Sequence, residues 1–311
     1  MDNLVYLSYG RGPHVDELVY SLHSALYMLG PDRNSCRITV YTDNPTALRD
    51  LPIKIELLTE KTLADWAGPF DFNHRRKIFA IKHALKKFGG RLIYCDADTF
   101  FMKHPKKAFA SVRRGHTLMH IGEYHLYDSC ARKLADFVQD HHLRNQAGQC
   151  WNITLATAMF NAGVLGLDEA DIGVLDEVLH LTDQIYPHVR IPTVEQFAFS
   201  VCLHRYTKLR QSYRIIHHYW PPERRALFRG QLSRVLHDCS IPSSEERFRQ
   251  LWAKRPSQTI RDRPFKSPCE RGLKKRIYVT FWGAANRTGM LTPLKRIAAH
   301  VGFLHNNKSV E

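Results

Sequence analysis

Two aspartates with one residue between them, Asp96 and Asp98, directly follow the apolar run Leu-Ile-Tyr-Cys. In an extended segment, residues two apart point to the same side, so the two carboxylates are expected to lie together. Neighbouring carboxylates repel each other unless a cation lies between them. Mg²⁺ and Mn²⁺ prefer oxygen ligands and commonly keep phosphate oxygens in their coordination shell. The pair therefore indicates a site for a divalent metal and a diphosphate, with a solvated acidic turn as the alternative.

The same string partly matches the motif of haloacid-dehalogenase-like phosphatases, in which the first aspartate of an Asp-x-Asp pair is the nucleophile. That motif places threonine or valine two residues after the second aspartate, whereas Phe100 holds this position here and Thr99 lies one place early. The phosphatase motif also normally lies on the first strand, and this pair begins some 95 residues into the chain. The phosphatase interpretation is therefore disfavoured.

The elements that must position the aspartates alternate between strand and helix patterns. Apolar, β-branched and aromatic runs predict strands, and apolar residues at helical spacing predict helices. The predicted strands span residues 3–10, 36–45, 53–58, 91–101, 159–167 and 213–222. The predicted helices span residues 14–30, 73–90, 168–187 and 192–205, the last with Thr193 as its N-cap. Such alternation favours an α/β sheet with helices on both faces, and ligands bind beyond the carboxyl ends of its strands.

A set of short motifs follows in a fixed order: a basic helix, Asp-Ala-Asp, Phe-Asn-Ala-Gly-Val, Val-Glu-Gln-Phe and Ile-Ile-His-His-Tyr-Trp. In this order the chain resembles the GT-A fold glycosyltransferases, most closely those of family 8, over roughly residues 1–225. The resemblance implies a Rossmann-like, mostly parallel sheet. Residues 226–311 lie outside it, and from their basic, irregular composition we expect an extension that packs on this sheet. The family often ends with His-x-x-Gly-x-x-Lys-Pro-Trp, and this chain has Thr-Phe-Trp-Gly-Ala-Ala-Asn-Arg-Thr-Gly instead.

The resemblance implies transfer of a hexose from a nucleotide-sugar, usually a UDP-sugar, with Mn²⁺ or Mg²⁺, to a glycan or lipid-linked acceptor. Each part of the donor has its expected contacts. The nucleoside is expected at Ser8, Tyr9, Gly10 and Asp43, and the metal and diphosphate at Asp96 and Asp98. The sugar is expected at Asn161, Ala162 and Gly163. Arg75 and Lys77 of the basic helix are expected to make further contacts to the donor.

A histidine completes the metal shell in the family, and His217 and His218 are the candidates. Side chains alternate across a strand, so only one of the two can face the aspartates. Neutral imidazole is a common metal ligand. We expect His218 to be that ligand, with a buried neutral histidine as the alternative.

The stereochemistry depends on the side chains beside the anomeric carbon, where the resemblance places Glu195 and Gln196. A retaining enzyme, which the resemblance implies, needs no strong base opposite the leaving group. An inverting enzyme needs a carboxylate within reach of the acceptor hydroxyl, and Glu195 or Glu123 could serve. The sequence leaves both outcomes open.

Charge and composition limit the partners and the compartment. The 311 residues include 45 Lys and Arg against 30 Asp and Glu, a net charge of +15, which favours anionic partners. The segment 251–300, with 12 basic and two acidic residues and interleaved aromatics, has two interpretations: peripheral contact with an anionic membrane, or a solvated basic region whose aromatics pack on the catalytic domain. No run approaches the roughly 18 apolar residues of a membrane span, and no basic signal segment begins the chain, so we expect a cytoplasmic protein, peripheral at the inner membrane face.

Two other classes remain as alternatives. A nucleotidyltransferase would share the fold, but its glycine-rich loop near the N-terminus is not matched by Ser-Tyr-Gly-Arg-Gly-Pro. A nucleic-acid-binding protein would account for the charge, yet no RRM, zinc-finger or helix-turn-helix pattern is present, so we expect no nucleic-acid partner.

Overall fold

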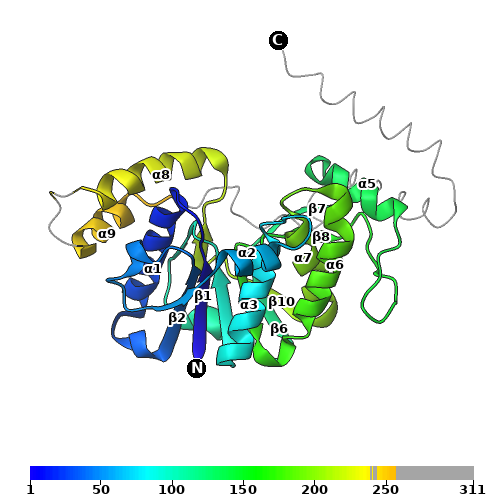
Figure 1. The fold of residues 1–311 in the computed structure, drawn as a ribbon, viewed down its shortest axis with the longest axis horizontal. Coiled ribbons are helices and arrows are strands. Elements are labelled where there is room, and N and C mark those ends of the chain that lie inside the picture. The colour runs from blue at the N-terminus through cyan, green and yellow to red at the C-terminus, as the bar shows by residue number, and fades with distance from the viewer. Residues whose placement is uncertain (239, 241–243, 257–311) are drawn as a thin grey trace, which may run out of the picture.

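A computed structural model describes residues 1–238, 240 and 244–256, and its centre is a seven-stranded sheet (Figure 1). The strand order is β10-β6-β9-β4-β1-β2-β3. The strands span Lys208–Gln211, His116–Met119, Val164–Asp168, Arg91–Cys95, Asp2–Leu7, Cys36–Thr42 and Lys54–Leu57, in that order. All neighbours pair in parallel except β9, which is antiparallel to both β4 and β6. The mostly parallel α/β sheet predicted from the sequence is confirmed.

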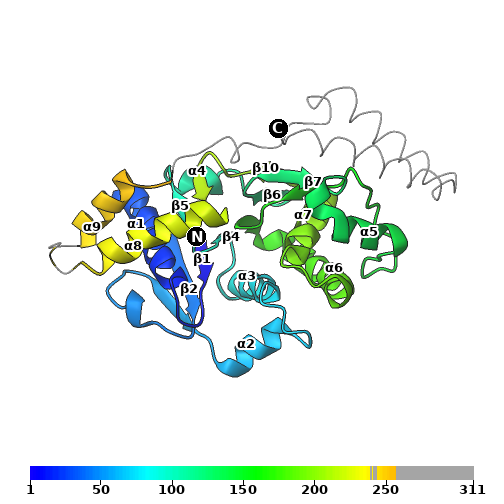
Figure 2. The same ribbon diagram turned by 90° about the horizontal axis from the view of Figure 1, so that it is seen from above.

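Helices cover both faces of this sheet, as the sequence predicted (Figure 2). Side chains of β1 and β4 alternate between the two faces, so each strand contributes to both cores. One core joins the sheet to α1 (His14–Leu29) and α4 (Lys106–Phe109). The other joins it to α3 (Arg75–Phe88), α6 (Val174–Val189) and α7 (Val194–Tyr206). Burial on both faces explains why the central strands read as nearly continuous apolar runs.

The reversed strand β9 differs from the sequence prediction. Residues 159–167 were expected to form one strand, but the chain forms β8 (Ala158–Phe160) and β9, separated by three residues. The break has a local cause, because the Asn161 side-chain oxygen accepts a hydrogen bond from the Gly163 N–H at 2.9 Å. An asparagine that bonds the backbone two residues on stabilises a turn in place of a strand. Since β9 runs against β4, this turn lies where β4 ends.

Two small sheets and a helical cap complete the site region. The strand β11 (Ile216–His218) pairs antiparallel with β5 (Thr99–Phe101), and β7 (Gly122–His125) pairs with β8. The helices α8 (Pro222–Leu236) and α9 (Ser244–Ala253) pack on α1 through a cluster of aromatic rings (Figure 1). The predicted division of the chain after residue 225 remains a prediction, and residue 225 itself lies within α8.

The remaining helices are α2 (Glu60–Ala67), which leads into α3, and α5 (Arg132–Asp140), which packs beside α6. The predicted helix 192–205 corresponds to α7, although Thr193 at its N-cap makes no side-chain capping bond. Among the described residues, no helix combines the length and the apolar character needed to cross a bilayer. Most of the predicted basic segment, residues 257–300, lies outside the described residues.

Candidate functional site

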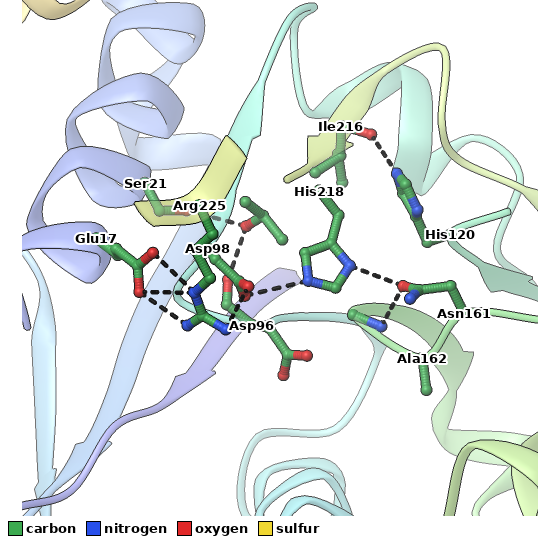
Figure 3. A network of polar contacts seen from close by, with 12 residues as sticks. Glu17, Ser21, Asp96, Asp98, His120, Asn161, Ala162, Ile216, His218 and Arg225 are labelled. Atoms are coloured by element: carbon green, nitrogen blue, oxygen red, sulfur yellow. Dashed lines mark hydrogen bonds and ion pairs between the residues drawn. The ribbon is translucent and has the colours of Figure 1, made fainter. Parts of the chain in front are cut away.

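The two aspartates lie in a tight turn between β4 and β5. The Thr99 hydroxyl donates to the Asp96 carbonyl at 2.8 Å and closes the turn. The turn, and not an extended segment as the sequence argument assumed, therefore brings the carboxylates together. One ligand atom from each of Asp96, Asp98 and His218 lies within 4.8 Å of the other two (Figure 3). Two carboxylates and an imidazole are a donor set that Mn²⁺ or Mg²⁺ can use, so these residues fit a divalent metal.

The position of His218 depends on the pairing of β11 with β5, which sets it opposite Thr99. Its Nε2 lies 3.1 Å from the Asp98 carboxylate, and its Nδ1 lies 2.8 Å from the Asn161 side-chain oxygen. The bond to Asn161 fixes the ring orientation and leaves Nε2 facing the aspartates. Burial alone lowers the pKa of His218, but the Asp98 carboxylate outweighs burial and raises that pKa above its usual value. His217 points to the other side of the strand and contacts the Phe100 ring.

Asp98 is held by two partners, the His218 imidazole and the Arg225 guanidinium. One carboxylate oxygen bonds His218, and the other pairs with the Arg225 guanidinium at 2.9 Å (Figure 3). Burial raises the pKa of Asp98, but His218 and Arg225 together hold that pKa well below its usual range. Asp98 is therefore ionised despite being only 3% exposed.

A buried lysine, Lys77 in the first turn of α3, links the aspartates to the sugar-pocket candidates. Its ammonium group contacts Glu195 at 2.9 Å, Asp96 at 3.2 Å and the Ala162 carbonyl at 3.1 Å. Burial lowers the pKa of Lys77, but the two carboxylates outweigh it and raise the pKa, so the lysine carries its charge. Glu195 accepts this contact through its Oε1 atom and is only 2% exposed.

A second polar cluster adjoins the first around Gln196. Its side-chain oxygen accepts from the Ala162 N–H at 3.2 Å, and its amide nitrogen donates to Glu123 at 2.8 Å. Asn161 donates to the other oxygen of Glu123 at 3.2 Å. Burial raises the pKa of Glu123 above its usual value, although the bonds from Gln196 and Asn161 oppose this. The Gln196 amide is therefore fixed in one orientation.

A cavity of about 330 Å³ opens beside the metal cluster. Its lining combines the end of β1, the start of α3, the aspartate turn and α8; among its residues are Ser8, Tyr9, Lys77, Asp96, Asp98 and Arg225. The structure thus brings together predicted nucleoside, phosphate and metal residues in one hollow. A volume of this size lies at the lower end of the range for small-molecule sites.

Two other predicted donor residues lie in different settings. The exposed Asp43 carboxylate accepts the Gly10 N–H at 2.9 and 3.0 Å, which ties the ends of β1 and β2 together. Gly10 has a φ of 75°, a conformation that favours glycine. Arg75 instead pairs with Asp183 of α6 and bonds carbonyls near the end of α2, and it does not line the cavity.

The sequence prediction missed two residues of the site, Arg225 and Glu17. Arg225 follows His218 by only seven residues, in the run Pro-Pro-Glu-Arg-Arg, so the proximity of an arginine to the histidine pair was an available signal. Glu17 carried no signal beyond an acidic residue on an otherwise apolar helix face, because its partners lie more than 200 residues away.

Comparison with known proteins gives fold-level likenesses at low identity. No protein-family model matches the chain, and no curated protein sequence matches it. Two glycosyltransferases are among the solved structures that this chain resembles. The galactosyltransferase LgtC, solved in complex with donor and acceptor sugar analogues, is 14% identical with a TM-score of 0.48, covering 84% of this chain and 98% of that one. Mouse xyloside xylosyltransferase 1 in its apo form is 13% identical with a TM-score of 0.43, covering 68% and 85%.

Proposed function

We propose that this chain is a metal-dependent, GT-A-type glycosyltransferase that moves a hexose from a UDP-sugar to a glycan or lipid-linked acceptor with retention of configuration. The observation that carries the proposal is the convergence of Asp96, Asp98 and His218 beside a cavity at the carboxyl edge of the sheet. Ligands of α/β sheets bind at this edge.

The metal cluster suits a diphosphate leaving group. Asp96, Asp98 and His218 would hold Mn²⁺ or Mg²⁺, which supplies positive charge to the diphosphate as the sugar–phosphate bond breaks. Lys77 and Arg225 add fixed cations on either side of the aspartates. Preorganised positive groups at the position where charge develops lower the barrier most effectively.

The cavity provides a place for the nucleoside beside these cations. The Tyr9 ring lies at its wall with the Arg76 guanidinium 4.6 Å from the ring centroid, and Ser8 lines it too. An aromatic face with adjacent polar groups can stack a base. Asp43 and the Gly10 N–H lie next to Tyr9, at the ends of β1 and β2. We assign the nucleoside to Ser8, Tyr9, Gly10 and Asp43. We propose that uracil is the preferred base.

The turn between β8 and β9 provides the sugar side of the site. Asn161 bonds His218 and Ala162 bonds Gln196, so this turn joins the metal cluster to the glutamine. None of these residues lines the cavity, and the proposed place of the hexose is on the cavity side of the turn. In this arrangement Glu195 positions Lys77 through their 2.9 Å ion pair, and Gln196, held by Ala162 and Glu123, is the proposed side chain nearest the sugar.

The state of Glu195 supports retention. A general base must be free to accept the acceptor's proton, and a carboxylate that is buried and paired with Lys77 is not. Glu123 is held by Gln196 and Asn161. The group nearest the anomeric carbon is then the neutral Gln196 amide, which is not a base.

The testing experiment screens nucleotide-sugars for Mn²⁺-dependent release of the sugar, and compares UDP, GDP, ADP and CDP by calorimetry. We expect UDP to bind best, EDTA to abolish turnover, and Asp98→Asn to abolish turnover with little change in shape. The control Asp65→Asn, on the exposed side of α2, should retain full activity. Full turnover in EDTA or in Asp98→Asn, or tighter binding of an oligonucleotide than of UDP with Mn²⁺, would overturn the proposal.

A further inference from the structure

Arg225 has a position that the proposed metal and donor chemistry leaves unexplained, because it pairs with Asp98, one of the three proposed metal ligands. We propose that Arg225 acts as a coupling residue, which opposes metal binding at Asp98 on its own and favours it when a diphosphate binds at the same time. This inference rests on the proposed function.

The guanidinium of Arg225 has two anionic partners on opposite sides (Figure 3). Its Nη1 lies 2.9 Å from Asp98, while its Nε and Nη2 bond the Glu17 carboxylate at 3.0 and 2.8 Å. Arginine presents its donors in a planar fork, so one guanidinium can bridge two carboxylates in a fixed geometry. Arg225 therefore lies at the wall of the cavity with its Asp98-facing side directed at the metal ligands.

Glu17 holds Arg225 in place from α1. Its carboxylate is completely buried and also accepts a bond from Arg229 of the next turn of α8 at 2.9 Å. A buried carboxylate needs such cationic partners, so α8 is fixed to α1 at this point. Arg225 consequently cannot withdraw far from Asp98 while α8 keeps its place.

Charge accounting shows why a metal ion alone is opposed. Four buried or partly buried carboxylates, Asp96, Asp98, Glu17 and Glu195, face three fixed cations, Lys77, Arg225 and Arg229. The set is thus nearly neutral already, and a divalent ion at Asp98 lies directly beside the Arg225 guanidinium. Like charges in a poorly solvated site repel strongly.

A diphosphate removes this conflict. The diphosphate of a nucleotide-sugar is doubly negative, so together with a divalent ion it adds no net charge to the set. Its oxygens also offer Arg225 an acceptor that replaces Asp98, and arginine–phosphate bonds are strong and often bidentate. Metal and diphosphate should therefore bind with positive coupling, and by linkage each raises the affinity of the other equally.

The experiment titrates Mn²⁺ into the full chain alone and with saturating UDP, following free Mn²⁺ by electron paramagnetic resonance, and the same titrations without protein give the Mn²⁺ that UDP binds in solution, which is subtracted. We expect wild type to bind Mn²⁺ at least tenfold more tightly with UDP. In Arg225→Gln, Mn²⁺ alone should bind severalfold more tightly than in wild type, and the enhancement by UDP should fall towards one. The control Arg234→Gln removes an exposed arginine of α8 that is outside this set, and it should couple as wild type does.

The outcomes separate the two proposals. Wild type that binds neither UDP nor Mn²⁺ overturns the proposed function and this inference with it. Wild type that couples the two ligands, with Arg225→Gln coupling them equally, overturns this inference alone. If circular dichroism shows that Arg225→Gln does not fold, Arg225→Lys replaces it, because lysine keeps the charge but lacks the two-sided fork. The logarithm of the coupling factor should then fall by at least half. Undiminished coupling in Arg225→Lys would refute the assignment.

Discussion

Gly163 lies so close to His218 that no larger residue fits beside the ring. A Cβ atom built at this position would overlap the imidazole, which is itself held by Asn161 and Asp98. Gly163 also supplies the carbonyl that accepts the Asp96 N–H at 2.8 Å. One small residue thus sets the spacing between the aspartate turn and the histidine.

Gly163→Ala should therefore weaken Mn²⁺ binding and cost about 1–3 kcal/mol of unfolding free energy through overpacking. Urea unfolding and Mn²⁺ titration measure the two effects. Gly173→Ala is the matched control, because a Cβ there meets no atom within 4 Å, and it should leave Mn²⁺ binding unchanged. Equal behaviour of the two variants would contradict the packing argument.

Lys77 is the residue on which the buried carboxylates depend. Lys77→Met removes the cation that faces Asp96 and Glu195, and breaking a buried pair in this way costs about 3–5 kcal/mol. Adding Glu195→Gln to that variant removes one stranded charge and should recover part of the loss. Urea unfolding of the four proteins of this cycle gives the coupling energy. A cycle that is additive within about 0.5 kcal/mol would show that the pair is not energetically coupled.

His23 on α1 gives a pH-dependent prediction away from the metal residues. Burial lowers the pKa of His23, whose ring stacks near Phe248 of α9. The unfolded chain therefore binds the proton more readily, and the contribution of His23 to stability is present above about pH 6.5 and is lost as pH falls through its folded pKa. His23→Gln should reduce the loss of stability between pH 7.5 and 5.5, by no more than about 1.4 kcal/mol per pH unit. Urea unfolding at both pH values tests this, and an unchanged or steeper dependence would refute it.

At the residue scale, the sequence pattern identified site residues whose signal is local. The aspartates, the Asn161–Gly163 segment and His218 all stood out because polar groups interrupted apolar strands. Arg225 and Glu17 did not, since a cation seven residues after a histidine and an acid on a helix become partners only when α8 packs on α1. Pairing between residues about 200 positions apart in the sequence depends on tertiary packing, and a local sequence pattern does not predict it.

At the scale of elements, the packing of α8 matters because this helix determines where Arg225 lies. Leu232 is fully buried and Phe228 nearly so, within the aromatic cluster that joins α8 and α9 to α1. Leu227, one residue from Phe228, is 71% exposed. One face of α8 therefore anchors the helix and the other faces solvent.

Leu232→Ala should cost about 2–5 kcal/mol of unfolding free energy, because it opens a cavity in this cluster. Leu227→Ala should change stability by less than about 0.5 kcal/mol. Thermal or urea unfolding checks both. If the two variants behaved alike, α8 would not be anchored as the structure describes.

Most elements were predictable from their periodicity, and the exceptions have physical reasons. The strands β1 and β2 and the helices α1, α3 and α7 match their apolar patterns closely, whereas the aspartate turn divides the predicted strand 91–101 into β4 and β5. The break between β8 and β9 was missed because a single apolar run contained both, and only the Asn161 turn separates them. The direction of β9 was also hidden, since a strand buried on both faces has the same pattern whichever way it runs.

At the scale of the whole molecule, the net charge of +15 is unevenly placed along the chain. The aromatic residues Phe265, Tyr278, Phe281 and Trp282, expected to contact a membrane, lie outside the described residues. Trp252 is described, and its ring packs against Phe248 at 5.7 Å between centroids. Trp252 thus belongs to the helical cap and is engaged within the protein.

The full chain should co-sediment with anionic vesicles at low salt and dissociate at high salt, because each surface cation contributes about 1 kcal/mol near an anionic membrane and salt screens this attraction. Neutral vesicles are the control. Failure to bind anionic vesicles at low salt would leave the basic segment as a solvated region whose aromatics pack on the protein.

The long separations between site partners have a consequence for how the protein is made. Asp98 and His218 are 120 residues apart, Lys77 and Glu195 are 118 apart, and Glu17 and Arg225 are 208 apart. During synthesis the aspartate turn therefore leaves the ribosome soon after Lys77 but long before Arg225 and His218. Contacts of high sequence separation also form slowly. The nascent chain must accordingly carry Glu17 and Asp98 through much of translation without their native partners.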